Sequence, residues 1–571
     1  MTAAEVLRYT AGPGTGKTFE LLRRIGVEAE DHGTRIGDLA FTTFARSQAE
    51  DVKARIRTVY PEAGAKEITA AVSTIHAAAL RACRSAGILD EDARIIAEGS
   101  KKDSHFFEEF AAAHHLPYDP ARARLAFAPD DDRAAGKAEP PGNALFRIAR
   151  YIVGKYTWSW IHAPRAMTAI GAHIPPSYGD AAELLEAWSA FKADRHLYEH
   201  DDYIRLAIDH SAPAPARILV VDEFQDLSPL QFVLVEMWRR SGDVDRVYVA
   251  GDPNQSIYGF RGADPIYLER IPGPVEDIGA TAERRPPSRR CPAAIVAVAD
   301  RVLGGRSNMA PRSAGGVVEV REGPEFAAVV EALHRRYGAV MVLARYQRDA
   351  RRLSAALTAA GLPHSSLHPD RLTPWQKART VAGAVVDPGE VLAALDAIAV
   401  YERAGHPWTL EHDRAEALTA AGRPRVRPEA VRGYLSGGTP VHIADVLGWF
   451  GLEARPGAAR AIAAGGLALP EKFGPGFLAA FDRGIGRPAR SAITVDTIHQ
   501  AKGREAPAVV LHTGYQKARA REYLQNPAIE AEERRVYYVG ITRASEHLVI
   551  LDGLRSGPAA PPLRVIPGVR S

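Results

Sequence analysis

The sequence of 571 residues contains only two cysteines, Cys83 and Cys291, far apart along the chain. Two such residues cannot build a disulfide framework or a cysteine-rich zinc site, and this scarcity is typical of a reducing cytoplasm. No apolar run approaches the roughly 18 to 20 residues needed to cross a bilayer, and the first residues lack a signal-peptide core. We therefore expect a cytoplasmic protein with no membrane partner.

An excess of charge of one sign is also missing, because the formal net charge is only +3. Bulk charge therefore gives no argument for nucleic acid. The chain is too long to fold around one hydrophobic core, so several domains are expected. Hydrophobic residues make up 46% of the chain and charged residues 25%. These fractions indicate an ordinary globular enzyme.

Short apolar runs alternate with helical stretches along much of the chain. This alternation predicts an α/β fold whose strands form parallel sheets. The runs fall into two groups, one on each side of about residue 285, which indicates two sheets. The best strand candidates are residues 38–42, 218–222, 246–251, 340–344 and 508–511.

Two long helical segments, residues 90–198 and 379–487, interrupt this alternation. Structureless loops of that length are improbable, so each segment is interpreted as an insertion domain. The first α/β domain then consists of residues 1–89 and 199–283. The second α/β domain consists of residues 284–378 and 488–571, with the second insertion inside it.

A Gly-rich loop follows the first apolar run and precedes a helical stretch. The glycines let backbone N–H groups approach phosphate oxygens closely, and the helix N-terminus adds its positive dipole. Lys17 is expected to contact the β- and γ-phosphates, and the Thr18 hydroxyl is expected to bind Mg²⁺. The candidate nucleotide-binding residues here are Ala11, Gly12, Pro13, Gly14, Thr15, Gly16, Lys17, Thr18 and Phe19.

An acidic cluster follows the apolar run at residues 218–221. The carboxyl ends of parallel strands are where nucleotide sites form in open sheets. Asp222 is suited to hold Mg²⁺, and Glu223 is suited to orient and deprotonate the attacking water.

A polar turn with aromatic residues, residues 252–263, follows the next strand candidate. With the two segments above, it resembles superfamily 1A helicases, the UvrD/Rep/PcrA group of DNA motors. The resemblance implies that Gln255 senses the γ-phosphate and that Phe260 stacks on a DNA base beside Tyr258 and Arg261. The family usually has tryptophan where Phe260 stands.

Further segments resemble the family's DNA-contacting motifs. They are residues 39–50, 73–76 and 497–505. The resemblance assigns a set of polar and aromatic residues to the DNA side, and packing is an equal explanation for the two histidines. The set is Thr43, Phe44, Arg46, Thr74, His76, Thr497 and His499.

Two arginine-containing segments resemble the family's motifs IV and VI, at residues 288–292 and 532–544. The resemblance implies that Arg290 and Arg543 neutralise charge on the γ-phosphate, as guanidinium groups do in phosphoryl transfer. By the same likeness, Glu505 contacts the ribose.

The base side of the nucleotide site departs from the family pattern. Only ten residues precede Ala11 and none is glutamine, whereas relatives have a glutamine that reads adenine. Phe19 replaces a common arginine, and Arg289 replaces the tyrosine that stacks on adenine. Relaxed base selectivity is one hypothesis, with Arg289 or Phe19 stacking on the base; a start codon upstream of Met1 is the other.

The resemblance as a whole implies two RecA-like domains with ATP and Mg²⁺ in the cleft between them. It implies 3′→5′ movement on single-stranded DNA and tailed duplexes, by a monomer or a weakly self-associating protein. Two alternatives stay open: a DNA-stimulated translocase that strips proteins without unwinding, and a P-loop regulatory ATPase without nucleic acid. Repair, replication and defence against foreign DNA are pathways that such motors serve.

Overall fold

The computed structural model forms two compact units, Met1–Gly316 with Arg521–Thr542, and Val317–Ala520 with Arg543–Ser571. Within these units, the residues that the structure describes are 3–44, 46–90, 92–123, 139–155, 159–259, 262–272, 275–276, 286–305, 307–367, 372–380, 383, 385–406, 408–423, 431, 435, 438–484, 492–552 and 559–569.

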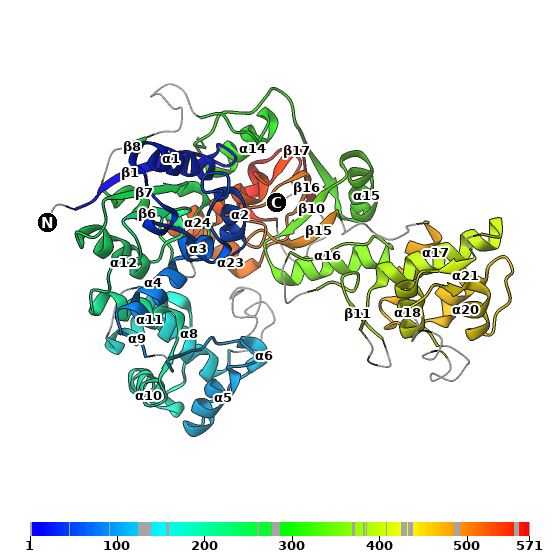
Figure 1. The fold of residues 1–571 in the computed structure, drawn as a ribbon, viewed down its shortest axis with the longest axis horizontal. Coiled ribbons are helices and arrows are strands. Elements are labelled where there is room, and N and C mark those ends of the chain that lie inside the picture. The colour runs from blue at the N-terminus through cyan, green and yellow to red at the C-terminus, as the bar shows by residue number, and fades with distance from the viewer. Residues whose placement is uncertain are drawn as a thin grey trace. The chain divides into compact units, whose positions relative to one another are not determined.

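The first unit is built on a six-stranded sheet in the order β3-β2-β6-β7-β1-β8. All neighbouring strands run parallel. The strands β1, β6 and β7 lie side by side at its centre (Figure 1). Their bounds are β1 Glu5–Thr10, β2 Leu39–Thr43, β3 Val72–Thr74, β6 Ile218–Val221, β7 Arg246–Gly251 and β8 Val275–Glu276.

The side chains of the central strands point alternately to the two faces of this sheet, and helices cover both faces. Leu219 and Val221 of β6 pack into one core with α4, α11 and α12, while Ile218 and Val220 pack into another with α1, α2 and α3. Successive strand side chains point to opposite faces, so a continuous apolar run serves both cores. The helices are α1 Lys17–His32, α2 Arg46–Ile56, α3 Ala65–Ala71, α4 Ile75–Ser85, α11 His200–Asp209 and α12 Pro229–Arg240.

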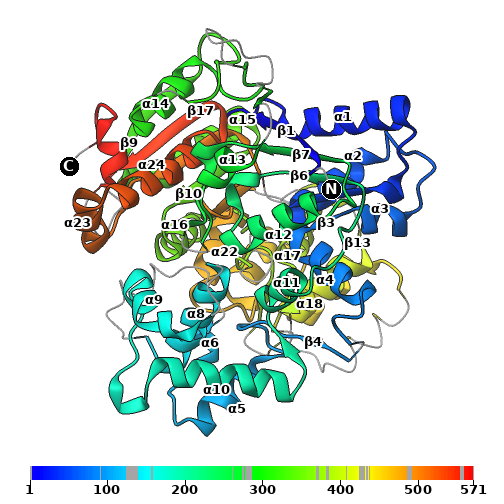
Figure 2. The same ribbon diagram turned by 90° about the vertical axis from the view of Figure 1, so that its left-hand side faces the viewer.

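The segment between α4 and α11 forms a helical group (Figure 2). This group has its own core, rich in aromatic side chains. Trp188 packs against Phe107, Phe110 and Phe146, with ring centroids 4.8 to 5.2 Å apart. The chain leaves and returns through two short parallel strands, β4 Arg94–Ile95 and β5 Leu197–Tyr198. The described helices are α5 Ser104–Ala113, α6 Pro120–Ala123, α8 Pro141–Gly154, α9 Ala163–Ile170 and α10 Ala181–Asp194.

The second unit contains a five-stranded sheet in the order β15-β10-β16-β17-β9, again parallel throughout. The helices α15 and α16 pack on it through a core of mostly aliphatic side chains. The bounds are β9 Val317–Glu322, α15 Phe326–Tyr337, β10 Val340–Ala344, α16 Gln347–Ala359, β15 Ile493–Thr497, β16 Ala506–His512 and β17 Ala544–Asp552.

A second helical group, between α16 and β15, packs around a separate core that includes Trp375, Phe450 and Phe477. Two antiparallel strand pairs accompany its helices. The elements are β11 Ala378–Arg379, β12 Val385–Val386, α17 Pro388–Ala404, β13 Thr409–Leu410, α18 His412–Ala421, β14 Val441–His442, α20 Ile443–Trp449, α21 Ala458–Ala461 and α22 Gly474–Asp482.

The predicted α/β fold with two parallel sheets is confirmed and is consistent with two RecA-like domains. The strand predictions at 246–251 and 340–344 match β7 and β10, and the others differ from the observed strands by at most two residues at an end. The compact units group residues differently from the predicted domains. Residues 286–316 and the helix α24, Pro527–Ile541, pack in the first unit. The domain and insertion boundaries themselves stay a prediction.

Candidate nucleotide site and DNA side

The Gly-rich loop lies directly after β1 and is held in a tight ring by its own polar groups. The Ala11 N–H donates to the Gly251 carbonyl at 3.2 Å, which ties the loop to the end of β7. Gly14 and Gly16 have φ values of +70° and +95°. Glycine adopts this left-handed region without strain. The Lys17 ammonium donates to the carbonyls of Ala11 and Gly12 at 2.9 and 3.1 Å, so a cation is already centred on the loop.

Thr18 and Asp222 meet beside this loop. The Thr18 hydroxyl donates to Asp222 Oδ2 at 2.6 Å, and Asp222 Oδ1 accepts from the Glu223 N–H at 2.9 Å. Burial, with the nearby Glu223 charge, raises the pKa of Asp222 to about 6. A hydroxyl and a buried carboxylate are hard oxygen ligands of the kind that Mg²⁺ prefers. The donor set therefore fits this ion.

Glu223 adopts an unusual backbone conformation at the end of β6. Its φ is +56°. This value lies in the left-handed region that side chains with a Cβ rarely occupy. Glu223 is half-buried, and its carboxylate accepts a hydrogen bond from the Gln225 side-chain amide. Such a backbone conformation persists only where the surrounding structure holds it in place. It therefore supports the hypothesis that Glu223 has a functional role.

The turn after β7 is tied to the same cluster through Gln225. The Gln225 side-chain oxygen accepts from the Asp252 N–H at 3.0 Å, and Asp252 Oδ2 accepts from the Gln255 amide at 2.9 Å. Burial raises the pKa of Asp252. No role for Gln225 or Asp252 is predicted from the sequence. The Asp-Glu-x-Gln spacing after a buried strand is the only signal that could have found Gln225.

Residues 288–290 contact the Gly-rich loop within the first unit. The Ser288 hydroxyl donates to the Pro13 carbonyl at 2.8 Å, and the Arg289 N–H donates to the Gly14 carbonyl at 2.7 Å. A Cβ on Gly14 would lie 2.7 Å from the Arg290 Cβ, so only glycine fits there.

The two predicted base-side residues also meet. The Arg289 guanidinium carbon lies 5.1 Å from the centre of the Phe19 ring, and that ring is 51% exposed. A guanidinium at this distance attracts the ring face. The structure therefore brings together the two residues that depart from the family pattern.

On the DNA side, Phe44 and Tyr258 stack on each other, with centroids 4.6 Å apart and an interplanar angle of 21°. Thr43, at the end of β2, is buried. Phe260 and Arg261 lie outside the described residues, as does the side chain of Arg46. Phe44, at the end of β2, and Tyr258, after β7, are thus the two predicted DNA-side aromatic residues that the structure describes.

Thr74 and His76 have local structural partners. The Thr74 hydroxyl accepts from the Ala77 N–H at 3.3 Å. A hydroxyl in this position caps the N-terminus of α4. His76 Nε2 lies 3.5 Å from Asp201 Oδ1, and its ring meets Tyr203 edge-on. These contacts place His76 at the interface between α4 and α11. Its contact with DNA stays a prediction.

The remaining predicted residues belong to the second unit, with one exception. Thr497, at the end of β15, is buried, while His499 is half-buried and Glu505 is exposed. Arg543 is only 1% exposed and donates to the Arg504 carbonyl at 3.1 Å. The exception is Arg290, which belongs to the first unit, where its Nη1 donates to the Thr542 carbonyl at 3.2 Å. Thr542 immediately precedes Arg543 in the sequence.

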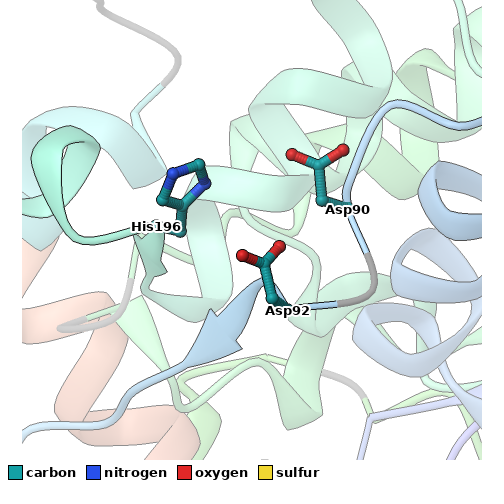
Figure 3. Close-up of side chains that lie close together, drawn as sticks. All are labelled: Asp90, Asp92 and His196. Atoms are coloured by element: carbon teal, nitrogen blue, oxygen red, sulfur yellow. The ribbon is translucent and has the colours of Figure 1, made fainter.

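Two clusters of metal-ligating residue types in the described part of the chain were not anticipated from the sequence: Asp90 with Asp92 and His196, and His412 with Asp413 and Glu416. Asp90, Asp92 and His196 each direct one ligand atom to a common point, within 4.8 Å of one another (Figure 3). All three are exposed. Water solvates exposed groups of this kind without an ion. We assign no function to either cluster.

Comparisons with known families match both ends of the chain. The AAA domain family matches residues 1–261, and the UvrD-like helicase C-terminal domain matches residues 484–552. The chain belongs to the UvrD-like helicases of superfamily 1. The first match contains the Gly-rich loop, Asp222 and Gln255, and the second contains Thr497, Glu505 and Arg543. Arg289 and Arg290 lie between the two matches.

Individual relatives agree with this family. The chain is 27% identical to the ATP-dependent DNA helicase UvrD2 of Mycobacterium tuberculosis over 595 residues, which covers 96% of this chain and 76% of the relative. It is 24% identical to UvrD1 of the same organism, covering 95% and 80%. The helicase PcrA of Leuconostoc citreum is 28% identical over 45% of this chain and 32% of the relative. Among the described residues, none of the helices has the length and apolarity of a membrane span.

Proposed function

We propose that this chain is an ATP-dependent translocase on single-stranded DNA and a DNA helicase with 3′→5′ polarity. The main support for the proposal is that one turn, the one after β7, contains residues of both the nucleotide side and the DNA side. Gln255, tied to the nucleotide cluster through Asp252, and Tyr258, stacked on Phe44, lie three residues apart in sequence. A change at the γ-phosphate therefore reaches the aromatic pair along a few backbone bonds. Membership of the family and the relatives' names as DNA helicases add support.

The nucleotide roles follow from the chemistry of the residues. Lys17 exchanges its loop carbonyls for the β- and γ-phosphates, and Thr18 and Asp222 hold Mg²⁺. That ion supplies positive charge to the phosphate oxygens. Glu223 orients the attacking water and accepts its proton, while Gln255 senses the γ-phosphate. Arg290 and Arg543 neutralise the charge that develops during transfer, and Glu505 contacts the ribose.

Phe19 and Arg289 form the platform for the base in this proposal. A guanidinium and a phenyl ring offer flat faces without the fixed donor and acceptor pattern that distinguishes adenine from guanine. The nucleotide would be recognised mainly through its phosphates. Relaxed selectivity among nucleoside triphosphates follows.

In this proposal DNA bases stack on Phe44, Tyr258 and Phe260, and the other DNA contacts are assigned to Thr43, Arg46, Thr74, His76, Arg261, Thr497 and His499. Base stacking on an aromatic ring contributes about 1–3 kcal/mol and tolerates any base. Stacking of this kind suits a motor that must release and rebind bases of every sequence. The protein acts as a monomer or with weak self-association.

The test combines ATPase rates with and without single-stranded DNA and unwinding of duplexes with 3′ or 5′ tails. Stimulation together with unwinding of the 3′-tailed duplex alone is the expected result. Stimulation without unwinding of either substrate would select a translocase that strips proteins. An ATPase rate unchanged by DNA would contradict both and indicate a regulatory ATPase.

A further inference from the structure

The helix α24, Pro527–Ile541, contacts both sides of the proposed site within the first unit. Near its middle, Arg535 Nε donates to the Ser256 carbonyl at 2.9 Å. Just beyond its end, the Thr542 carbonyl accepts from Arg290 Nη1 at 3.2 Å and from Cys291 Sγ at 3.7 Å. One helix thus joins the turn after β7 to the segment that packs on the Gly-rich loop.

Ser256 is the point at which this helix contacts the turn. It is 2% exposed, and its hydroxyl donates to the Gln225 carbonyl at 3.0 Å. It stands between Gln255 and Tyr258, so its carbonyl lies on the short backbone path from the nucleotide side to the DNA side. The hydrogen bond from Arg535 to the Ser256 carbonyl therefore fixes the direction in which the turn continues toward Tyr258.

A second contact holds the turn against the helix. A Cβ on Gly259 would lie 2.7 Å from Glu532 Oε1, so the backbone there approaches the first half of α24 closely. Glu532 and Arg535 are three residues apart and share one helix face. Burial lowers the pKa of Arg535, as expected for a guanidinium enclosed between helix and turn.

The helix is suited to transmit a displacement. From Arg535 to Thr542 an α-helix advances by about 10 Å, at roughly 1.5 Å per residue. Hydrogen bonds along the helix make it stiff compared with a loop. A shift of Arg290 or of the backbone at Thr542 would therefore move Arg535 with it.

We propose that Arg535 is a positioning residue that couples the nucleotide side to the DNA side through α24 and the Ser256 carbonyl. It contacts neither nucleotide nor DNA in this account, and acts through the turn that carries Tyr258. The inference rests on the proposed DNA-stimulated ATPase. It adds a second connection beside the backbone path from Gln255.

The test compares Arg535→Gln with Arg534→Gln in the full-length chain. Arg534 is a matched control, because it lies on the same helix and its Nη1 donates to the Val302 carbonyl at 2.8 Å, away from the turn. Basal ATPase kcat and nucleotide Kd are measured without DNA, and ATPase is then titrated with oligo(dT). The thermal unfolding midpoint is recorded for each variant.

In Arg535→Gln we expect the maximal DNA stimulation to fall about tenfold, while basal kcat and nucleotide Kd stay within about twofold of the parent. Arg534→Gln should keep most of the stimulation. Arg535→Lys should recover part of it, because an ammonium can still donate to the carbonyl although it lacks the planar fork. Arg535→Lys becomes the deciding variant if Arg535→Gln does not fold.

The inference is overturned if Arg535→Gln is stimulated like the parent, or if both arginine variants lose stimulation equally. A parallel loss of basal kcat would also overturn it, since that result indicates a packing role. If the parent itself is not stimulated by oligo(dT), the proposed function fails and the inference fails with it. If oligo(dT) stimulates the parent and stimulates Arg535→Gln equally, the role of Arg535 is refuted while the proposed function stands.

Discussion

The proposed nucleotide side and the proposed DNA side of the first unit are built in opposite ways. Around the Gly-rich loop, polar groups are paired with protein partners at 2.6 to 3.2 Å, as between Thr18 and Asp222 or between Lys17 and the loop carbonyls. Across the turn, Phe44 and Tyr258 are half-buried and meet through ring faces. Directional bonds fix a geometry, whereas stacked rings accept many partners. Chemistry needs the first property and movement along a changing sequence needs the second.

Glu223→Gln should produce the largest effect, because it removes the proposed base while leaving a side chain of the same shape. We expect kcat to fall by about 10²–10⁴-fold with ATP binding retained. Steady-state ATPase and equilibrium binding of a fluorescent ATP analogue give the two quantities. A variant that kept more than about a tenth of the parent rate would show that another group accepts the proton.

Tyr258→Ala should weaken binding of single-stranded DNA by about 1–3 kcal/mol, or roughly 5- to 150-fold in Kd, because a stacking face is lost. Fluorescence anisotropy with a labelled oligonucleotide measures this change. Tyr267→Ala is the matched control, since Tyr267 stacks on Phe232 in a separate aromatic pair, with ring centroids 4.5 Å apart and an interplanar angle of 22°. Equal losses in the two variants would mean that Tyr258 acts through packing.

Gly14→Ala should disturb the fixed geometry of the loop. The positive φ of Gly14 disfavours a Cβ by about 1–3 kcal/mol. The new methyl group would also meet Arg290 at 2.7 Å. We expect ATP affinity to fall about tenfold or more, as measured by calorimetric binding. Unaltered ATP binding in Gly14→Ala would contradict the close approach.

Gly26→Ala is the matched control for this loop variant. Gly26 lies in α1 with open space where its Cβ would be. The substitution should leave ATP affinity unchanged and raise stability by roughly 0.5–1 kcal/mol, because alanine favours a helix interior over glycine. A loss of ATP affinity in both variants would show that the effect is not specific to the loop.

The smallest effect concerns the base platform of Phe19 and Arg289. If it recognises only flat aromatic surface, ATP, GTP and CTP should differ in kcat/KM by less than about a hundredfold, or about 2.8 kcal/mol. Arg289→Ala should lower kcat/KM for all three by a similar small factor. A larger preference for ATP in the parent would show that the site reads adenine.

Local patterns predicted the parts of this structure that depend on neighbouring residues. The apolar runs predicted the bounds of β7 and β10, and the glycines before Lys17 predicted the loop. The ties between distant segments were not predictable, because each joins groups that only the fold brings together. Gln225 with Asp252, Ser288 with Pro13 and Arg535 with Ser256 are examples. The grouping of residues 286–316 with the first compact unit was not predictable either, because no local pattern reports which core a segment packs against.

The central claim is that nucleotide and DNA binding are coupled through the turn from Gln255 to Tyr258. The most direct test measures the affinity of the Glu223→Gln protein for oligo(dT) with and without saturating ATP and Mg²⁺, because this variant is expected to bind ATP without hydrolysing it. Coupled sites change each other's affinity reciprocally, typically by about 5- to 150-fold. We predict a change of that size, in either direction, and a matching change in ATP affinity when DNA is added. Identical DNA affinities with and without bound ATP would contradict the coupling.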